Sequence, residues 1–148
     1  MIGIDPGASG GIVKLDDRTG ELIYADKFAD KTEHDIAELI GEYACSDAEQ
    51  DEAFIEAVHS MPKQGVASSF KFGRHFGFLI GLLTAMKIRY TLVTPQKWQG
   101  ALGCRTKGDK NITKANAQQP WPTEKWTHAT ADAALIAEYG RRATIPTH

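Results

Sequence analysis

The chain has 148 residues, of which 42% are hydrophobic, and this is enough for a single compact domain over residues 1–148 with its own core. Its two isolated cysteines fit no disulfide framework or zinc-ligand spacing, and its longest nearly apolar run, residues 76–86, is too short to span a bilayer. We therefore expect a cytoplasmic protein with no leader and no membrane partner. The net charge of −2 argues against a uniformly basic nucleic-acid-binding protein.

The first three elements are predicted to be antiparallel strands. Residues 1–5 form an apolar run that ends in Asp5, and residues 11–17 alternate as a half-buried strand does. Residues 21–28 follow a turn that ends at Gly20. An acid at the tip of the first strand is unusual enough to need an explanation.

The rest of the chain alternates helical and strand patterns. Helices are predicted over residues 32–44, 66–87, about 111–118 and 127–140, strands over 52–58 and 89–95, and a short helix or turn over 96–102. Thr32 and Thr127 are the expected N-caps, Pro95 ends the last strand, and Glu56 interrupts an otherwise apolar strand. This order predicts an α/β fold.

The helix over residues 66–87 carries two apolar stripes and a row of glycines. One stripe runs from Phe72 to Met86, and a second lies elsewhere on the helix, so one sheet face cannot bury both. Each glycine costs about 1 kcal/mol of helix propensity relative to alanine. Close approach of another backbone would offset that cost, which predicts a subunit interface at Gly73, Gly77, Phe78, Gly81 and Leu82.

Charge is distributed unevenly along the chain. Residues 1–56 carry a net charge of −11, residues 57–123 carry +9, and residues 124–148 are neutral. Two interpretations stay open: a binding surface for a polyanion, or a solvated surface whose two halves attract each other. The basic block also holds aromatic and amide side chains suited to bases and phosphates, namely Phe70, Phe72, Trp98, Gln64, Gln96 and Gln99, although core packing is preferred for Phe72.

Three acids stand where acids are awkward. Asp5 closes the first strand, Glu56 lies in an apolar strand, and Asp132 lies between alanines one helical turn after His128. Each alone has an ordinary explanation as a turn former, a strand end or a helix-terminal residue. Buried together, the carboxylates would repel one another and take up protons unless a cation neutralised them. Two Mg²⁺ or Mn²⁺ ions roughly 4 Å apart would do so and would support phosphodiester cleavage.

Six segments in this order and spacing resemble the RuvC-type Holliday-junction resolvases, especially compact phage-encoded members. They are "GIDPGASGG", "FIEAVHSMP", "SSFKFGRHFGFLIGLL", "TPQKWQ", "KGDKNITKANAQQ" and "HATADAALIAEYG". The resemblance spans nearly the whole chain. It implies a ribonuclease-H-like fold with a five-stranded mixed sheet flanked by helices. It also implies a homodimer that nicks two opposed strands of a four-way DNA junction symmetrically with Mg²⁺ or Mn²⁺.

The resemblance assigns catalytic and metal-binding roles to Asp5, Glu56 and Asp132. The family usually has an acid or histidine three residues before the last Asp, where this chain has Ala129. His128 is the nearest substitute on the same helix face, and Asp109 is a weaker candidate.

The resemblance also implies where DNA and the second subunit bind. The family's aromatic wedge has no Phe or Tyr counterpart in "HSMPKQG", so this role falls to Met61 or Phe70 or is absent. The long helix matches the dimer helix. The expected DNA-binding residues are Lys63, Gln64, Phe70, Lys71, Arg74, Lys97, Lys107, Lys110 and Lys114.

Other functions remain open from the sequence. The same carboxylate chemistry serves a nuclease that acts on flapped DNA, on other branched DNA or on RNA. A junction-binding recombination accessory protein could keep the fold without the chemistry. An actin-like or sugar-kinase fold also opens with an Asp and a Gly-rich hairpin, but 148 residues leave no room for its two lobes.

Overall fold

The structure is a computed structural model that describes residues 1–44, 51–57 and 65–144. One five-stranded sheet has the order β3-β2-β1-β4-β5. The strands β1 (Ile2–Asp5), β2 (Gly11–Leu15) and β3 (Leu22–Lys27) pair with one another antiparallel. On the other side of β1, the strands β4 (Glu52–Glu56) and β5 (Arg89–Val93) continue the sheet parallel to β1. The predicted mixed sheet with three antiparallel strands first is confirmed.

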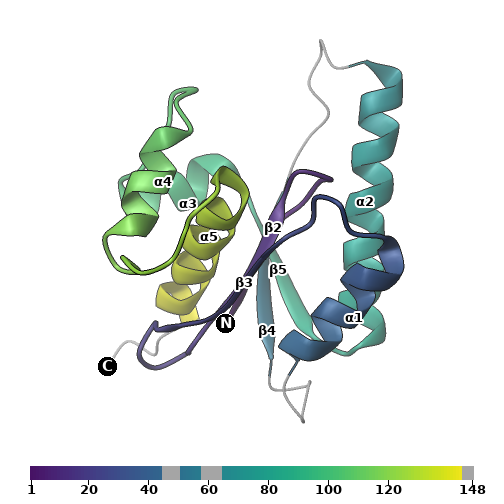
Figure 1. The fold of residues 1–148 in the computed structure, drawn as a ribbon, viewed down its shortest axis with the longest axis horizontal. Helices are drawn as coiled ribbons and strands as arrows, with labels where there is room; N and C mark the ends of the chain where they lie inside the picture. The colour runs from purple at the N-terminus through teal and green to yellow at the C-terminus, as the bar shows by residue number, and fades with distance from the viewer. Residues whose placement is uncertain (45–50, 58–64, 145–148) are drawn as a thin grey trace.

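Helices cover both faces of this sheet (Figure 1). The helices α1 (Glu33–Tyr43) and α2 (Val66–Ala85) cover one face, and α3 (Pro95–Leu102), α4 (Asn111–Gln118) and α5 (His128–Thr144) cover the other. Because strand side chains alternate between faces, Ile2 and Ile4 belong to the core under α1 and α2, whereas Val13 and Phe54 belong to the core under α5. The sheet therefore separates two hydrophobic cores.

The helix α5 lies unusually close to β1, and Gly3 makes this possible. A Cβ atom at Gly3 would lie 2.1 Å from the carbonyl oxygen of Ala133 and 2.4 Å from the amide nitrogen of Ala137. Small residues on both sides let the helix backbone rest almost directly on the strand. This contact fixes the position of the first half of α5 over the end of β1.

Side-chain caps define the helix starts. Thr32 forms a reciprocal capping box with Asp35 at the start of α1, and the Thr127 hydroxyl accepts a hydrogen bond from the amide of Thr130 at 3.1 Å. Both predicted N-caps are confirmed. The short element after β5 is the helix α3, with Thr94 as its cap and Pro95 in its first turn.

Two sequence predictions about individual elements are wrong. The strand β2 is buried along its whole length, including Lys14, which is 9% exposed, because α1 covers the face on which solvent was expected. The helix α5 continues past Gly140 to Thr144. Gly140 lies within the helix, where the absence of a Cβ atom makes room for the Phe54 ring, which would otherwise be 2.4 Å away.

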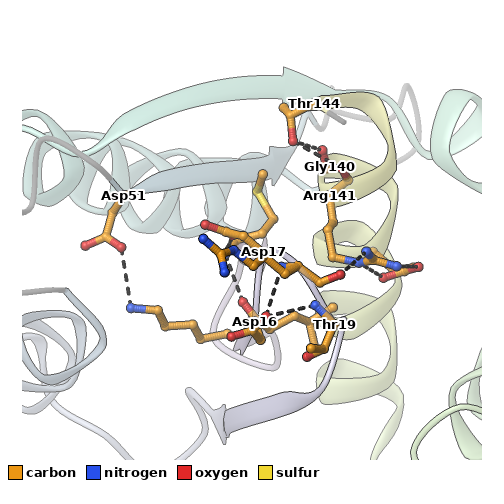
Figure 2. Close-up of polar contacts among 12 residues, drawn as sticks. Asp16, Asp17, Thr19, Asp51, Gly140, Arg141 and Thr144 are labelled. Atoms are coloured by element: carbon orange, nitrogen blue, oxygen red, sulfur yellow. Dashed lines mark hydrogen bonds and ion pairs between the residues drawn. The ribbon is translucent and has the colours of Figure 1, made fainter. Parts of the chain in front are cut away.

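Polar contacts connect the β2–β3 turn to the second half of α5 (Figure 2). The Asp16 carboxylate accepts hydrogen bonds from the amides of Arg18 and Thr19, which shapes the turn. Arg141 of α5 donates to the Arg18 carbonyl and pairs with Glu138. In the part of the chain that the structure describes, no helix is both long enough and apolar enough to cross a membrane.

Candidate active site

The sheet brings the first two acids together. Asp5 is the last residue of β1 and Glu56 the last residue of β4, and these parallel strands pair with Ile4 opposite Ile55. The two acids are the next residues on these neighbouring strands, so they lie side by side at the same end of the sheet. Strand alternation places both on the face that α5 covers, because Gly3 and Phe54, two residues earlier, lie on that face.

The start of α5 brings in the third acid. The backbone of Ala133 lies against Gly3, and that of Ala129 lies 3.3 Å from where a Cβ atom of Gly11 would be. Gly11 pairs with Asp5 across the β1–β2 ladder. Asp132 lies between these two contacts on the same helix, beside the end of β1.

The electrostatics show that the three carboxyls interact. Burial raises the pKa of Asp5 well above its usual range, and the charges of Glu56 and Asp132 raise it further. Burial also raises the pKa of Glu56 to about 7, with the charge of Asp132 adding to the effect. Burial raises the pKa of Asp132 as well. Three carboxyls that resist ionisation in one place are typical of a site that a cation completes.

The donor set suits a hard divalent cation. All three groups offer carboxylate oxygens, which Mg²⁺ and Mn²⁺ prefer. One of these oxygens, Asp132 Oδ1, is buried and has no hydrogen-bond partner among the described residues. Within residues 1–44, 51–57 and 65–144, however, no three Asp, Glu, His or Cys side chains are gathered closely enough to hold an ion as they stand.

Lys110 and His128 border the acids on the side of α4. The positive charge of Lys110, just before α4, lowers the pKa of all three carboxyls against the effect of burial. His128 is exposed in the first turn of α5, and its Nδ1 lies 3.2 Å from the Lys110 carbonyl oxygen. Its charge also lowers the pKa of Asp132. The structure therefore places His128 beside the third acid, as its spacing predicts.

Two of the acids have polar neighbours that sequence reasoning missed. The indole Nε1–H of Trp98 donates to Glu56 Oε2 at 2.7 Å. The Thr113 hydroxyl, which donates to the Lys110 carbonyl at 3.1 Å, lies close enough to Asp132 to lower the pKa of that carboxyl. Neither partner lies near its acid in the sequence. In the sequence, the one indication that Trp98 lies near Glu56 is that it follows shortly after the strand that pairs with β4.

The loop after Asp5 is also held by a side chain from another element. The amide of Gly7 donates to Nδ1 of His75 on α2 at 3.1 Å, and the His75 ring packs on Phe28. Burial lowers the pKa of this histidine, which favours the neutral ring that can accept a hydrogen bond. The helix α2 is thereby connected to the strand end that carries the first acid.

Trp98 is not a base-stacking residue, contrary to one interpretation of the basic block. Its side chain is 0% exposed because it fills the core between the sheet and α5. Phe70, in contrast, is 72% exposed near the start of α2. The helix α2 connects the parallel strands β4 and β5, so it runs antiparallel to them. It therefore begins at the end of the sheet where Asp5 and Glu56 lie (Figure 1). Phe70 is therefore an exposed aromatic side chain on that side, while Phe72 is half-buried and packs near Gly7, in line with the preference for packing stated for it.

The predicted basic residues lie on both sides of the sheet. Lys71 and Arg74 are exposed on α2, and Arg74 forms an ion pair with Glu33 at 2.8 Å. Lys97 is exposed on α3, while Lys107, Lys110 and Lys114 are exposed around the start of α4. Lys63, Gln64 and Met61 lie outside the described residues.

The glycine row of α2 faces open space. A Cβ atom at Gly73, Gly77 or Gly81 would meet no described atom within 4 Å, and Phe78 and Leu82 are only half-buried. The close approach that these glycines suggest is therefore not made by the described part of this chain. The predicted subunit interface stays a prediction.

A cavity of about 740 Å³ lies at the other end of α5, away from the acids. Its wall includes Trp121, Glu138 and Arg141. Glu138 and Arg141 pair with each other at 2.8 Å, and the Trp121 indole donates to the Gly20 carbonyl, so these polar groups serve the packing of the β2–β3 turn. None of the three acids lines this cavity.

Comparison with known proteins identifies the fold. The sequence matches no protein-family model and no curated protein. Among solved structures, two of Thermus thermophilus RuvC are similar. One has a TM-score of 0.62 at 16% identity, covering 97% of this chain and 95% of that chain. The other, in complex with a Holliday junction substrate, has a TM-score of 0.65 at 14% identity, covering 97% of both chains.

A viral protein shares the same architecture. The Fowlpox virus resolvase, in a complex with substrate Holliday junction DNA, has a TM-score of 0.57 at 15% identity and covers 96% of this chain and 98% of that chain. The chain therefore has the fold that RuvC and this viral resolvase share.

Proposed function

We propose that this chain is a metal-dependent, structure-specific endodeoxyribonuclease that resolves four-way DNA junctions by paired symmetric nicks. Each subunit of a homodimer would contribute one nuclease domain over residues 1–148. The observation that carries the proposal is the meeting of Asp5, Glu56 and Asp132, whose burial and mutual charge oppose ionisation. The Holliday junction complexes of the two similar resolvases support the choice of substrate.

The three carboxylates would hold Mg²⁺ or Mn²⁺, with two ions per site and His128 completing the ligand set. Such ions, when bound, activate water and stabilise the leaving oxygen in phosphodiester hydrolysis. Because the carboxyls do not converge on one point unaided, we expect the cation to draw them together. His128, exposed beside Asp132, would complete the site or move a proton.

The exposed basic residues of α2, α3 and the start of α4 would contact phosphates on both sides of the acids without reading sequence. The ion pair between Arg74 and Glu33 is exposed on both sides, so exchanging Glu33 for a phosphate costs about 1 kcal/mol or less. Phe70 would stack on a base at the opened junction centre. Lys63 and Gln64 belong to the same proposal.

The dimer would form through α2. Its glycine row leaves space for a second backbone, and Phe78 and Leu82 supply apolar contact area. Leu92 on the edge strand β5 is 51% exposed and Tyr90 is 38% exposed, so apolar surface continues beyond the helix. Two active sites related by a two-fold axis would account for symmetric nicking.

Asp5→Asn tests the chemistry. This substitution should abolish Mg²⁺- or Mn²⁺-dependent nicking of a synthetic four-way junction while junction binding in a gel-shift assay is retained. Glu52→Gln, at the end of β4 away from the acids, is the control and should nick normally. Undiminished nicking by Asp5→Asn would refute the assignment. Flap, duplex and RNA substrates in the same assay test the other nucleases of this chemistry, and metal-dependent product excludes a non-catalytic accessory protein.

A further inference from the structure

One contact at the candidate site connects a core residue directly to a catalytic acid. The Trp98 indole Nε1–H donates to Glu56 Oε2 at 2.7 Å. This distance is in the range of hydrogen bonds with an ionised partner. Trp98 is fully buried, while Glu56 is the last residue of β4 and is partly exposed.

The fold fixes the position of this indole. Val93, the last residue of β5, is paired with Glu56, and α3 begins two residues later at Pro95 with Thr94 as its cap. Trp98 is one turn into this helix, and its ring packs in the core between the sheet and α5. The direction of its N–H group therefore depends on the packing of the whole ring, not on a flexible side chain.

The chemistry of the contact favours the carboxylate. An indole N–H can only donate, so it binds an ionised oxygen more strongly than a protonated one. A carboxylate has two oxygens and about four lone-pair sites, of which this bond uses one. The remaining sites can serve a cation while Trp98 restrains the rotation of the group.

We infer that Trp98 is a positioning residue that orients the Glu56 carboxylate for divalent-cation binding. The inference rests on the proposed function, because it requires Glu56 to be a metal ligand. Groups that hydrogen-bond to a ligand in this way usually contribute 10- to 100-fold to metal affinity. Trp98→Phe, which keeps a ring but removes the donor, should therefore raise the Kd for Mn²⁺ by about 10-fold or more.

Trp126→Phe is the matched control. Trp126 is also buried, at 4% exposed, and its indole N–H donates to the Trp121 carbonyl at 3.0 Å, so this substitution also removes one buried indole donor. It leaves Glu56 untouched. Titration calorimetry with MnCl₂ on the full chain compares the two variants with the wild type.

A measurement on the unmodified protein covers the case in which Trp98→Phe does not fold. The chain has three tryptophans, so ¹⁵N-labelled protein should give three indole N–H signals. Addition of Mg²⁺ should shift the Trp98 signal far more than those of Trp121 and Trp126. These two signals are assigned from their Phe variants. A Trp98 signal that does not respond to Mg²⁺ would overturn the inference.

Glu56→Gln separates this inference from the proposed function. If Glu56→Gln weakens Mn²⁺ binding and Trp98→Phe does not, the positioning role is wrong and the metal site stands. If Glu56→Gln binds Mn²⁺ like the wild type, both are wrong. Loss of affinity in Glu56→Gln and Trp98→Phe, with Trp126→Phe unchanged, is the result that we expect.

Discussion

Replacing Glu56 with glutamine should stabilise the metal-free protein at alkaline pH. Burial holds the pKa of this carboxyl at about 7 in the folded chain, against an ordinary value of 4.5. A carboxyl with a higher pKa when folded binds protons more tightly in the folded state. Its contribution to stability is therefore complete below about pH 4.5 and is lost as the pH rises through 7.

The size of the effect follows from the two pKa values. The rise from 4.5 to about 7 corresponds to roughly 3 kcal/mol of unfolding free energy lost between pH 4 and pH 8. Glutamine keeps the shape and an oxygen that can accept from Trp98 but carries no charge. For a chain of this length, about 3 kcal/mol corresponds to a difference in Tm of roughly 6–12 °C. This is an upper value, because the bond from Trp98 weakens when its acceptor is neutral.

Thermal unfolding followed by circular dichroism in EDTA, from pH 5 to pH 8, checks this prediction. The wild type should lose more stability than Glu56→Gln as the pH rises. Glu52→Gln, at the other end of the same strand, is the control and should follow the wild type. Addition of Mg²⁺ at pH 8 should raise the Tm of the wild type more than that of Glu56→Gln. Parallel pH profiles for the wild type and Glu56→Gln would show that the carboxyl cluster is not strained by charge.

Three further substitutions test the packing of the fold and the proposed subunit interface. Lys14→Met should lower the unfolding free energy by about 3 kcal/mol in urea titrations, because it removes a cation 3.4 Å from the buried Asp51 (Figure 2). An unchanged unfolding free energy would contradict a stabilising role for this ion pair. Gly3→Ala should cost on the order of 3 kcal/mol, since its Cβ atom would meet the Ala133 carbonyl, and an unchanged Tm would show that α5 can move away freely. Gly77→Leu, where a Cβ atom meets nothing within 4 Å, should convert the proposed dimer to monomers in sedimentation velocity without lowering monomer stability.

The sequence was sufficient for the acids and for most of the elements. Each of Asp5, Glu56 and Asp132 has an ordinary local explanation, and they could be singled out only because all three occur at apolar positions of one chain, where burying them together needs a cation. The N-caps at Thr32 and Thr127 were equally readable, since capping depends on residues within one turn.

The contacts that failed to show in the sequence are those between distant elements. Lys14 looked solvent-exposed from its alternation with Val13, but its Nζ contacts the carbonyl of Tyr43, 29 residues away. Gly140 looked like a helix stop, whereas its role in α5 is to make room for the Phe54 side chain of strand β4. Local patterns report which residues share a face, and only the assembled sheet determines what covers that face.

The arrangement of the site has a consequence for stability. Glu56 accepts a hydrogen bond from Trp98 of α3, Asp132 lies beside Thr113 of α4, and the loop after β1 is hydrogen-bonded to α2, so the acids come together only when both helical layers are packed. Without a cation, burial and mutual repulsion oppose this assembly, and packing elsewhere must supply the difference. The close contact of α5 with β1 beside the acids is where that compensation should be concentrated, because any loosening there would let the carboxyls separate.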